Sequence, residues 1–316
     1  MSARDTIAAF EIIDGKLAVG GLPLDRLAAR IGSTPFFAYD RRLLTQRVAL
    51  LREKLPSKIN LSYAIKANPM PAVVQHLSSL VDSFDVASTG ELRIALDTPM
   101  RSDQISFAGP AKTIAELTQA VAAGVTIELE SITEARRVLA IGEKLGVRPR
   151  VAIRVNPDFA IKGSGMRMGG GPQQFGVDSE VVPQFLHELS KVDLNVLGFH
   201  VFGGSQNLRA DIICEAQRKT VELATKLAAA MPSPVRYLNL GGGFGIPYFD
   251  KDESLNLAMV GTNLQELFDG PIRNHFPEAR LVIELGRYIV GECGIYVTRV
   301  VDCKQSRGKQ FVMVDG

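Results

Sequence analysis

The stretch INLSYAIKANP, residues 59–69, decides the fold, because a short apolar run ends abruptly in the polar residues Lys66 and Asn68. A run of this kind beside a proline is typical of a buried strand. Similar runs recur along the chain, separated by stretches with the period of an amphipathic helix. They are DSFDVA (82–87), QISFA (104–108), VTIEL (125–129), RVAIRV (150–155), NVLGFHVF (195–202), RYLNL (236–240) and RLVIEL (280–285). The alternation predicts an α/β fold with a TIM-like (β/α)8 barrel.

Both ends of the chain fall outside this barrel. The runs TPFFAYD (34–40) and GIYVTRVVDCKQSRGKQFVMVDG (294–316) are typical of strands, and the second turns back near residues 306–308. We therefore expect a smaller β-domain formed from both chain ends. The expected division is residues 1–40 for its N-terminal part, 41–285 for the barrel, and 286–316 for the start of its C-terminal part, which is expected to be incomplete.

The composition restricts the class of partner. The 36 Lys and Arg residues nearly balance the 34 Asp and Glu residues, and no long run of like charge occurs, so neither a nucleic acid nor an anionic membrane is predicted as a partner. The chain has no run of about 18 apolar residues that could span a bilayer. Its opening, MSARDTIAAFEIIDG, lacks the apolar core of a secretory signal, so a cytoplasmic location is expected. A small-molecule partner is favoured.

The three cysteines do not form a recognisable pattern. Cys214, Cys293 and Cys303 lie far apart, and none belongs to a C-x-x-C pair. This spacing argues against a disulfide framework and against a zinc site. We expect three buried thiols and no metal.

Polar or glycine residues follow each predicted strand. In barrels of this kind the working groups lie at the C-terminal ends of the strands. Three glycines after the seventh strand and an arginine after the eighth match the usual phosphate site, where backbone N–H groups and a cation meet an anion. NLGGGFG is not a dinucleotide fingerprint, because Ile246 occupies the third glycine position. The candidates at the strand ends are Lys66, Asp85, Glu130, Arg154, His200, Ser205, Gly241, Gly242, Gly243, Glu284 and Arg287.

Seven motifs at these strand ends carry a resemblance to a known family. The chain resembles, over essentially its whole length, the ornithine/diaminopimelate/arginine decarboxylases, which are fold-type III pyridoxal-phosphate enzymes. The glycine-rich segment 162–178 is similar to that of a subgroup associated with exosortase gene clusters, and we expect it to be a mobile active-site loop. The motifs are YAIKANP (63–69), FDVASTGEL (84–92), FAGPAK (107–112), RVNPD (154–158), FHVFGGSQ (199–206), NLGGGFGIPY (239–248) and IELGRY (283–288).

The resemblance implies roles for the main candidates. Lys66 matches the lysine that forms the aldimine with pyridoxal 5′-phosphate, and Glu284 matches the glutamate that pairs with the pyridine nitrogen of the cofactor. Residues 241–243, with Ser205 and Arg287, match the phosphate ligands. We expect burial and nearby cations to lower the pKa of the Lys66 amine, which favours the free base. Leu285 replaces a proline common in the family and is expected to change only the turn.

The sixth-strand motif departs from the family pattern. Phe202 stands where family members commonly have a histidine stacked on the cofactor ring. A phenyl ring can stack in the same way but cannot carry a proton. His200 is a candidate for carrying a proton nearby; alternatively it is a core histidine with a purely structural role. Asp85 and Arg154 match residues that line the cofactor, or they form ion pairs at the barrel mouth.

The predicted function is decarboxylation of a basic or diamino acid, as in diaminopimelate decarboxylase. An alanine-racemase-like enzyme with the same fold and cofactor is one alternative, and a catalytically silent cofactor-binding regulator is another. The glycine, ELGR and FHVFGGSQ motifs favour the decarboxylase. Retention of Lys66, Glu284 and Arg287 argues against a silent protein.

The resemblance also implies a head-to-tail homodimer with shared active sites. Family members continue beyond the point that corresponds to Asp315 and Gly316, and supply a Cys-Asp or Cys-Glu motif and a tyrosine to the partner's site. Cys293 and Cys303 fall too early to match that motif. We expect the 316 residues to be a shortened form of such an enzyme, able to bind cofactor but not to turn over efficiently.

Overall fold

The protein is described by a computed structural model that covers residues 7–160, 166–167 and 169–316. Eight parallel strands close into a barrel, in which the fourth strand along the chain pairs with the fifth and the last pairs with the first. All eight strands expected from the sequence are confirmed. They are β5 (Asn60–Ala64), β6 (Ser83–Val86), β7 (Ile105–Phe107), β8 (Thr126–Leu129), β9 (Arg150–Asn156), β12 (Asn195–Val201), β14 (Tyr237–Gly242) and β15 (Arg280–Leu285).

Alternation along the strands produces two cores. On β15, Leu281 and Ile283 face outward and pack in the large core between strands and helices, whereas Val282 faces the barrel interior. Glu284 has the same parity as Val282, so the interior is apolar lower down and polar at the C-terminal ends of the strands. The sequence pattern thereby places its charged residues inside one end of the barrel.

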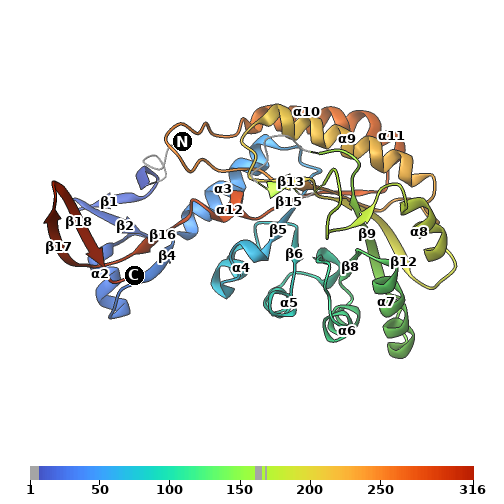
Figure 1. The fold of residues 1–316 in the computed structure, drawn as a ribbon, viewed down its shortest axis with the longest axis horizontal. Coiled ribbons are helices and arrows are strands. Elements are labelled where there is room, and N and C mark those ends of the chain that lie inside the picture. The colour runs from blue at the N-terminus through green and yellow to red at the C-terminus, as the bar shows by residue number, and fades with distance from the viewer. Residues whose placement is uncertain (1–6, 161–165, 168) are drawn as a thin grey trace.

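Helices surround the strands, and their caps define where several of them begin. Thr113 and Glu116 form a reciprocal capping box at the start of α6, and Ser131 caps α7 through the Glu134 amide. Figure 1 shows the helices covering the outside of the barrel. They are α3 (Arg41–Lys54), α4 (Pro71–Leu77), α5 (Thr89–Leu96), α6 (Ile114–Ala123), α7 (Ile132–Leu145), α8 (Val182–Leu189), α9 (Ala210–Ala228), α10 (Leu257–Leu267), α11 (Arg273–His275) and α12 (Arg287–Val290).

The smaller β-part lies to one side of the barrel and uses both chain ends (Figure 1). β4 from the N-terminal part pairs antiparallel with β16 from the C-terminal part. β17 and β18 form the expected hairpin, in which Arg307 and Gly308 both have positive φ. The elements are β1 (Glu11–Ile13), β2 (Lys16–Val19), β3 (Leu22–Pro23), α2 (Leu24–Ile31), β4 (Phe36–Tyr39), β16 (Gly294–Val297), β17 (Val300–Ser306) and β18 (Lys309–Val314).

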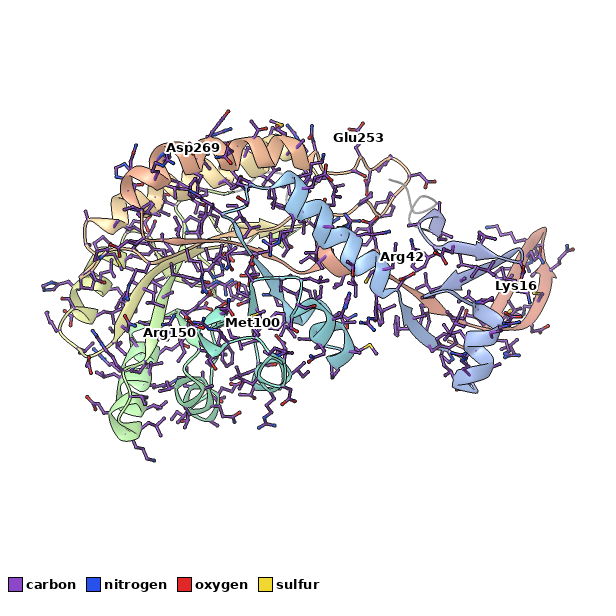
Figure 2. The ribbon with its side chains drawn as sticks, turned by 180° about the vertical axis from the view of Figure 1, so that it is seen from behind. Lys16, Arg42, Met100, Arg150, Glu253 and Asp269 are labelled. Carbon is purple, nitrogen blue, oxygen red and sulfur yellow. The ribbon has the colours of Figure 1, made fainter. Side chains whose placement is uncertain are left out.

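Arg42 lies where the two parts meet, at the start of α3 (Figure 2). Its guanidinium donates to the carbonyl oxygen of Ala9 and pairs with Asp40 and Glu11. Asp40 also caps α3 by accepting from the Arg42 amide. These contacts fix the approach of the N-terminal strands to the barrel.

Two further expectations can be compared with the structure. Cys214 and Cys293 are buried thiols as expected, but the expectation for Cys303 is wrong, because β17 belongs to an isolated hairpin that leaves it exposed. Of the segment 162–178, residues 162–165 and 168 lie outside the described residues. The remainder contains β10 (Met166–Arg167), paired with β13 (Gly204–Ser205), and β11 (Val177–Asp178), paired with β9. No helix in the described part of the chain has the length and apolar content needed to cross a membrane.

Candidate active site

A cavity of about 870 Å³ opens at the C-terminal ends of the barrel strands. Aromatic residues of the small β-part, Phe37 and Tyr39 on β4 and Tyr296 on β16, complete its wall. Four of the candidates from the sequence do not line it: Asp85, Glu130, Gly241 and Gly242. The predicted residues that do are Lys66, Arg154, His200, Phe202, Ser205, Gly243, Glu284 and Arg287.

Lys66 enters the cavity from a 3-10 turn, Ile65–Ala67, that directly follows β5. Its Nζ lies 3.3 Å from Asp85 Oδ2 and 3.5 Å from Glu284 Oε1. Burial would lower the pKa of the ammonium, but these two carboxylates outweigh burial and raise the pKa above its ordinary value. The expectation of a lowered pKa is therefore wrong for the protein alone, since the nearest charges are anions rather than cations.

Asp85 lies beneath Lys66 on β6 and is completely buried. Ser106 on the next strand donates to its Oδ1 at 3.2 Å. Burial and the charge of Glu284 raise the pKa of Asp85 well above its ordinary value, against the opposing charge of Lys66. Asp85 thus pairs with Lys66 rather than with Arg154.

Glu284 lies near the C-terminal end of β15. Asn239 donates to its Oε2 at 3.3 Å, and His200 Nε2 lies 3.5 Å from the same oxygen. Burial would raise the pKa of Glu284, but the charges of Lys66, His200 and Arg154 outweigh it and lower the pKa to about 2. Glu284 is therefore an ionised carboxylate whose other oxygen faces Lys66.

The glycine segment packs tightly against its neighbours. A Cβ on Gly243, which has φ +72°, would lie 2.2 Å from the carbonyl oxygen of Gly204, and one on Gly242 would lie 1.9 Å from that of Glu284. The Gly241 amide donates to the Asn239 side chain at 2.9 Å. Of the three glycines, Gly243 reaches the cavity lining.

Ser205 and Arg287 line the cavity together with Gly243, and a Cβ on Gly243 would lie 3.5 Å from the Cα of Ser205. Arg287 donates to Gln206 Oε1 at 3.3 Å, and its guanidinium lies 5.7 Å from the ring centroid of Tyr248. Its side chain is exposed. A hydroxyl, a guanidinium and a glycine backbone together form a donor set suited to an oxyanion.

His200 lies on β12, and Phe202 follows directly after the end of that strand. His200 is 2% exposed, and its ring centroid lies 6.4 Å from that of Phe202, with a tilt of 62° between the rings. Phe202 is half-buried and lines the cavity. Both side chains therefore line the cavity, and stacking of Phe202 on the cofactor ring stays a prediction.

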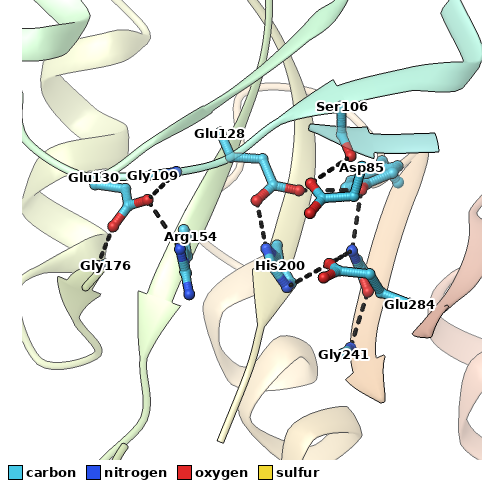
Figure 3. Close-up of polar contacts among 12 residues, drawn as sticks. Asp85, Ser106, Gly109, Glu128, Glu130, Arg154, Gly176, His200, Gly241 and Glu284 are labelled. Carbon is cyan, nitrogen blue, oxygen red and sulfur yellow. Dashed lines mark hydrogen bonds and ion pairs between the residues drawn. The ribbon is translucent and has the colours of Figure 1, made fainter. Parts of the chain in front are cut away.

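Arg154 is held by an acid that the sequence places at a strand end without giving it a role. Glu130 accepts from Arg154 Nη1 at 3.0 Å and from the backbone amides of Gly109 and Gly176 at 2.7 and 2.8 Å (Figure 3). The guanidinium of Arg154 also lies 4.8 Å from the ring centroid of Phe175. Glu130 therefore joins β9 to two loops at the cavity.

Glu128 is a buried acid that sequence reasoning missed. It lies on β8 inside the barrel, where its Oε2 is 2.5 Å from His200 Nδ1 and its Oε1 accepts from the Tyr237 hydroxyl at 3.2 Å (Figure 3). The available signal is the two-residue spacing in VTIELE, which puts Glu128 on the same face as Glu130. A charged residue inside a buried strand is rarely left without a partner.

The chain is similar in sequence to a known family of enzymes. Residues 41–291 match the family model for the pyridoxal-binding domain of pyridoxal-dependent decarboxylases. The chain belongs to this family. It is 33% identical over 285 residues to L-glutamyl-[BtrI acyl-carrier protein] decarboxylase of Niallia circulans, covering 90% of this chain and 67% of the relative. It is also 33% identical to diaminopimelate decarboxylase of Aquifex aeolicus, covering 96% and 71% of the two chains.

Solved structures agree with the family. Diaminopimelate decarboxylase from M. jannaschii in complex with L-lysine superposes with a TM-score of 0.88 at 26% identity, covering 98% of this chain and 74% of that one. The Helicobacter pylori enzyme complexed with L-lysine gives a TM-score of 0.81 at 28% identity, covering 93% and 73%. The protein is thus a pyridoxal-phosphate-dependent amino-acid decarboxylase, while membership of the exosortase-associated subgroup stays a prediction.

The residues of this decarboxylase fit pyridoxal phosphate. An amine and an ionised carboxylate, Lys66 and Glu284, lie together at the base of the cavity, where the Nε2 atom of His200 is buried without a hydrogen-bond partner among the described residues. Gly243 allows a close backbone approach and lines the cavity together with Ser205 and Arg287. The amine suits the aldehyde of the cofactor, and the carboxylate suits its pyridine nitrogen. The donors around Gly243 suit its phosphate.

Proposed function

We propose that Lys66 holds the cofactor and that Glu284 holds the proton on its pyridine nitrogen during decarboxylation of an amino acid. The observation that carries this proposal is the position of Lys66 Nζ in the cavity, within 3.5 Å of Glu284 Oε1. When bound, pyridoxal phosphate supplies the electron sink for the pair left behind as CO₂ departs. Asp85 keeps the Lys66 amine directed toward this point.

The other cavity residues bind and orient. Ser205, Gly243 and Arg287 provide hydroxyl, backbone and guanidinium donors for the phosphate. Gly241 and Gly242 do not line the cavity but shape the backbone that leads to Gly243. Phe202 offers an apolar face for stacking on the cofactor ring. Arg154, fixed by Glu130, presents a cation at the cavity wall.

The proposed substrate is a basic or diamino acid such as diaminopimelate. The name of the Aquifex relative and the L-lysine complexes of two structural relatives support this class. A screen for CO₂ release from diaminopimelate, ornithine, lysine and arginine by the reconstituted protein tests it. Release from one of them is the expected result. Exchange of the α-proton without CO₂ would favour the racemase alternative, and cofactor binding without either reaction would favour the regulator.

We further propose that the protein acts in the cytoplasm as a homodimer with shared active sites. The three cysteines are free thiols, which suits a reducing compartment. The small β-part carries exposed apolar residues, among them Phe37 and Phe311, that a second subunit can cover. Sedimentation velocity of the reconstituted protein tests the dimer, and a monomer at micromolar concentration would contradict it.

A further inference from the structure

Glu128 has no place in the function proposed so far. Its carboxylate is completely buried, and both oxygens are occupied: Oε2 by His200 Nδ1 at 2.5 Å, and Oε1 by the Tyr237 hydroxyl at 3.2 Å. It does not line the cavity. Burying a carboxylate is costly unless it is paired and hydrogen-bonded, so its contact with His200 calls for an account.

The contact fixes the direction of the imidazole. A carboxylate can only accept, so Nδ1 of His200 carries a proton toward Glu128. The opposite ring nitrogen, Nε2, then points toward Glu284 Oε2 at 3.5 Å and has no hydrogen-bond partner among the described residues. Asn239 donates to the same oxygen, whereas Oε1 of Glu284 faces Lys66.

We propose that Glu128 is a positioning residue that holds His200 as an imidazolium, whose Nε2–H orients the Glu284 carboxylate and keeps it ionised. The proposal rests on the proposed function in one respect, the role of Glu284 at the cofactor nitrogen. The line Glu128–His200–Glu284 crosses the barrel interior from β8 through β12 to β15 (Figure 3).

The charges around His200 support a protonated ring. Two carboxylates lie against its two ring nitrogens, Glu128 Oε2 at Nδ1 and Glu284 Oε2 at Nε2, so an imidazolium has an anionic partner on each side. Burial would lower the pKa of His200, but the charge and hydrogen bond of Glu128 and the charge of Glu284 outweigh burial and raise it. The charged or titratable groups facing this region are Lys66 after β5, Asp85 on β6, Glu128 on β8, Arg154 on β9, Tyr237 on β14 and Glu284 on β15.

The first test uses the protein without cofactor. Nuclear magnetic resonance of histidine-labelled protein follows the four imidazoles, and the His200→Gln variant assigns the signal of interest. In the wild type we expect His200 to titrate above the ordinary imidazole value of about 6.5. In Glu128→Gln the charge and hydrogen bond of Glu128 are lost and only the charge of Glu284 still opposes burial, so His200 is expected to titrate lower than in the wild type.

A matched control is Glu134→Gln. Glu134 is also a buried carboxylate with a cationic partner, Lys112, but it does not contact His200. It should lower the unfolding temperature without moving the His200 titration. An unchanged His200 titration in Glu128→Gln would overturn the proposal.

The second test covers the case in which Glu128→Gln folds poorly. Protein reconstituted with pyridoxal phosphate is titrated with acid and base, and the visible absorbance of the cofactor is recorded. His200→Gln decides this test: it is expected to displace the curve and to lower kcat about 10-fold with little change in KM. Where Glu128→Gln folds, it is expected to displace the curve in the same direction. Curves that superpose on the wild type would refute the inference, whereas failure of the wild type to bind cofactor would refute the proposed function and leave the apoprotein result intact.

Discussion

Lys66 lies between two carboxylates, which stabilise its ammonium form. Forming a covalent bond to an aldehyde requires the free amine, so a base has to accept a proton from this site. Asp85, whose pKa is raised by burial and by Glu284, is suited to take it. The two carboxylates thus favour the protonated form of Lys66, and one of them, Asp85, can accept its proton.

The role of Lys66 can be tested by absorbance. Lys66→Ala is expected to abolish the near-visible absorbance of protein incubated with pyridoxal phosphate and the adduct trapped by borohydride, because no amine remains in reach. Lys58→Ala is a control on a lysine that does not line the cavity. A borohydride-stable adduct retained in Lys66→Ala would reject the assignment.

The role of Glu284 separates binding from turnover. Glu284→Gln preserves shape but cannot hold a proton on the pyridine nitrogen, so kcat is expected to fall about 100-fold while the cofactor still binds. Stopped assays of CO₂ release, with cofactor content measured on the same samples, check both parts. Turnover near that of the wild type would show that the electron-sink argument is misplaced.

Glu284 also makes the fold sensitive to acid. Because its pKa is lowered to about 2 from an ordinary 4.5, its ionised form stabilises the folded state above pH 4.5, and that stabilisation is lost as the pH falls toward 2. We expect the unfolding free energy of the wild type to drop more steeply across this window than that of Glu284→Gln. Urea unfolding at several pH values measures the difference, and parallel curves would contradict it.

Phe202 offers a test of stacking. Phe202→Leu keeps an apolar side chain and removes the ring, so we expect the Kd for pyridoxal phosphate to rise by about 3- to 10-fold. Phe249→Leu changes an exposed phenylalanine that does not line the cavity and should leave the Kd unchanged. Equal Kd values for wild type and Phe202→Leu would indicate that another group covers the ring.

At the scale of elements, the strands were predictable because each is a short apolar run that ends in polar or glycine residues. The hairpin at residues 306–308 followed from the same kind of pattern. The partners across the barrel were not predictable, since Glu128 and His200 are 72 residues apart and periodicity carries no information on which strands face one another. The division of the chain at residues 40 and 285 stays a prediction.

The surroundings of Lys66 show the same limit. Its position after β5 follows from the sequence, but its neighbours come from β6 and β15, which the closed barrel brings together. From the sequence we expected cations near Lys66, but the structure places two carboxylates there. Arg154 is likewise bound by Glu130, the residue that follows the adjacent strand β8, rather than by a residue close in sequence.

Glu130 links β9 to the two loops that contain Gly109 and Gly176. Glu130→Gln replaces an acceptor oxygen with a donor group facing the amides of Gly109 and Gly176 or the guanidinium of Arg154, so we expect a loss of about 3 to 5 kcal/mol in unfolding free energy. Glu143→Gln on the exposed face of α7 is the control. Chemical denaturation of both variants measures the effect, and equal stabilities would show that Glu130 is not a structural clamp.

At the scale of the whole molecule, the cavity is built by two parts. The barrel supplies the charges, and β4 and β16 supply aromatic walls through Phe37, Tyr39 and Tyr296. β4 and β16 pair with each other although they come from opposite ends of the chain. Chemistry is therefore carried by the barrel, and the shape of the entrance depends on both termini.

The hairpin formed by β17 and β18 also belongs to this scale. It exposes Val301, Phe311 and Val312, of which Val301 is 67% exposed. If this surface contacts a second subunit, Val301→Lys combined with Phe311→Lys is expected to shift sedimentation toward monomer and leave the barrel's unfolding free energy unchanged. Lys309→Glu, at the start of β18, changes charge without removing apolar area and serves as the comparison.

Glu128 on β8 and Glu130 directly after it have a consequence for how the chain folds. Glu128 and Glu130 share one face, while Ile127 and Leu129 pack into the helix layer on the other. If β8 slipped by one position against its neighbours, both carboxylates would enter the oily outer layer and both aliphatic side chains would enter the charged interior. The two carboxylates therefore favour the native register of this strand during folding, because a register shift of one residue would bury both charges in an apolar layer.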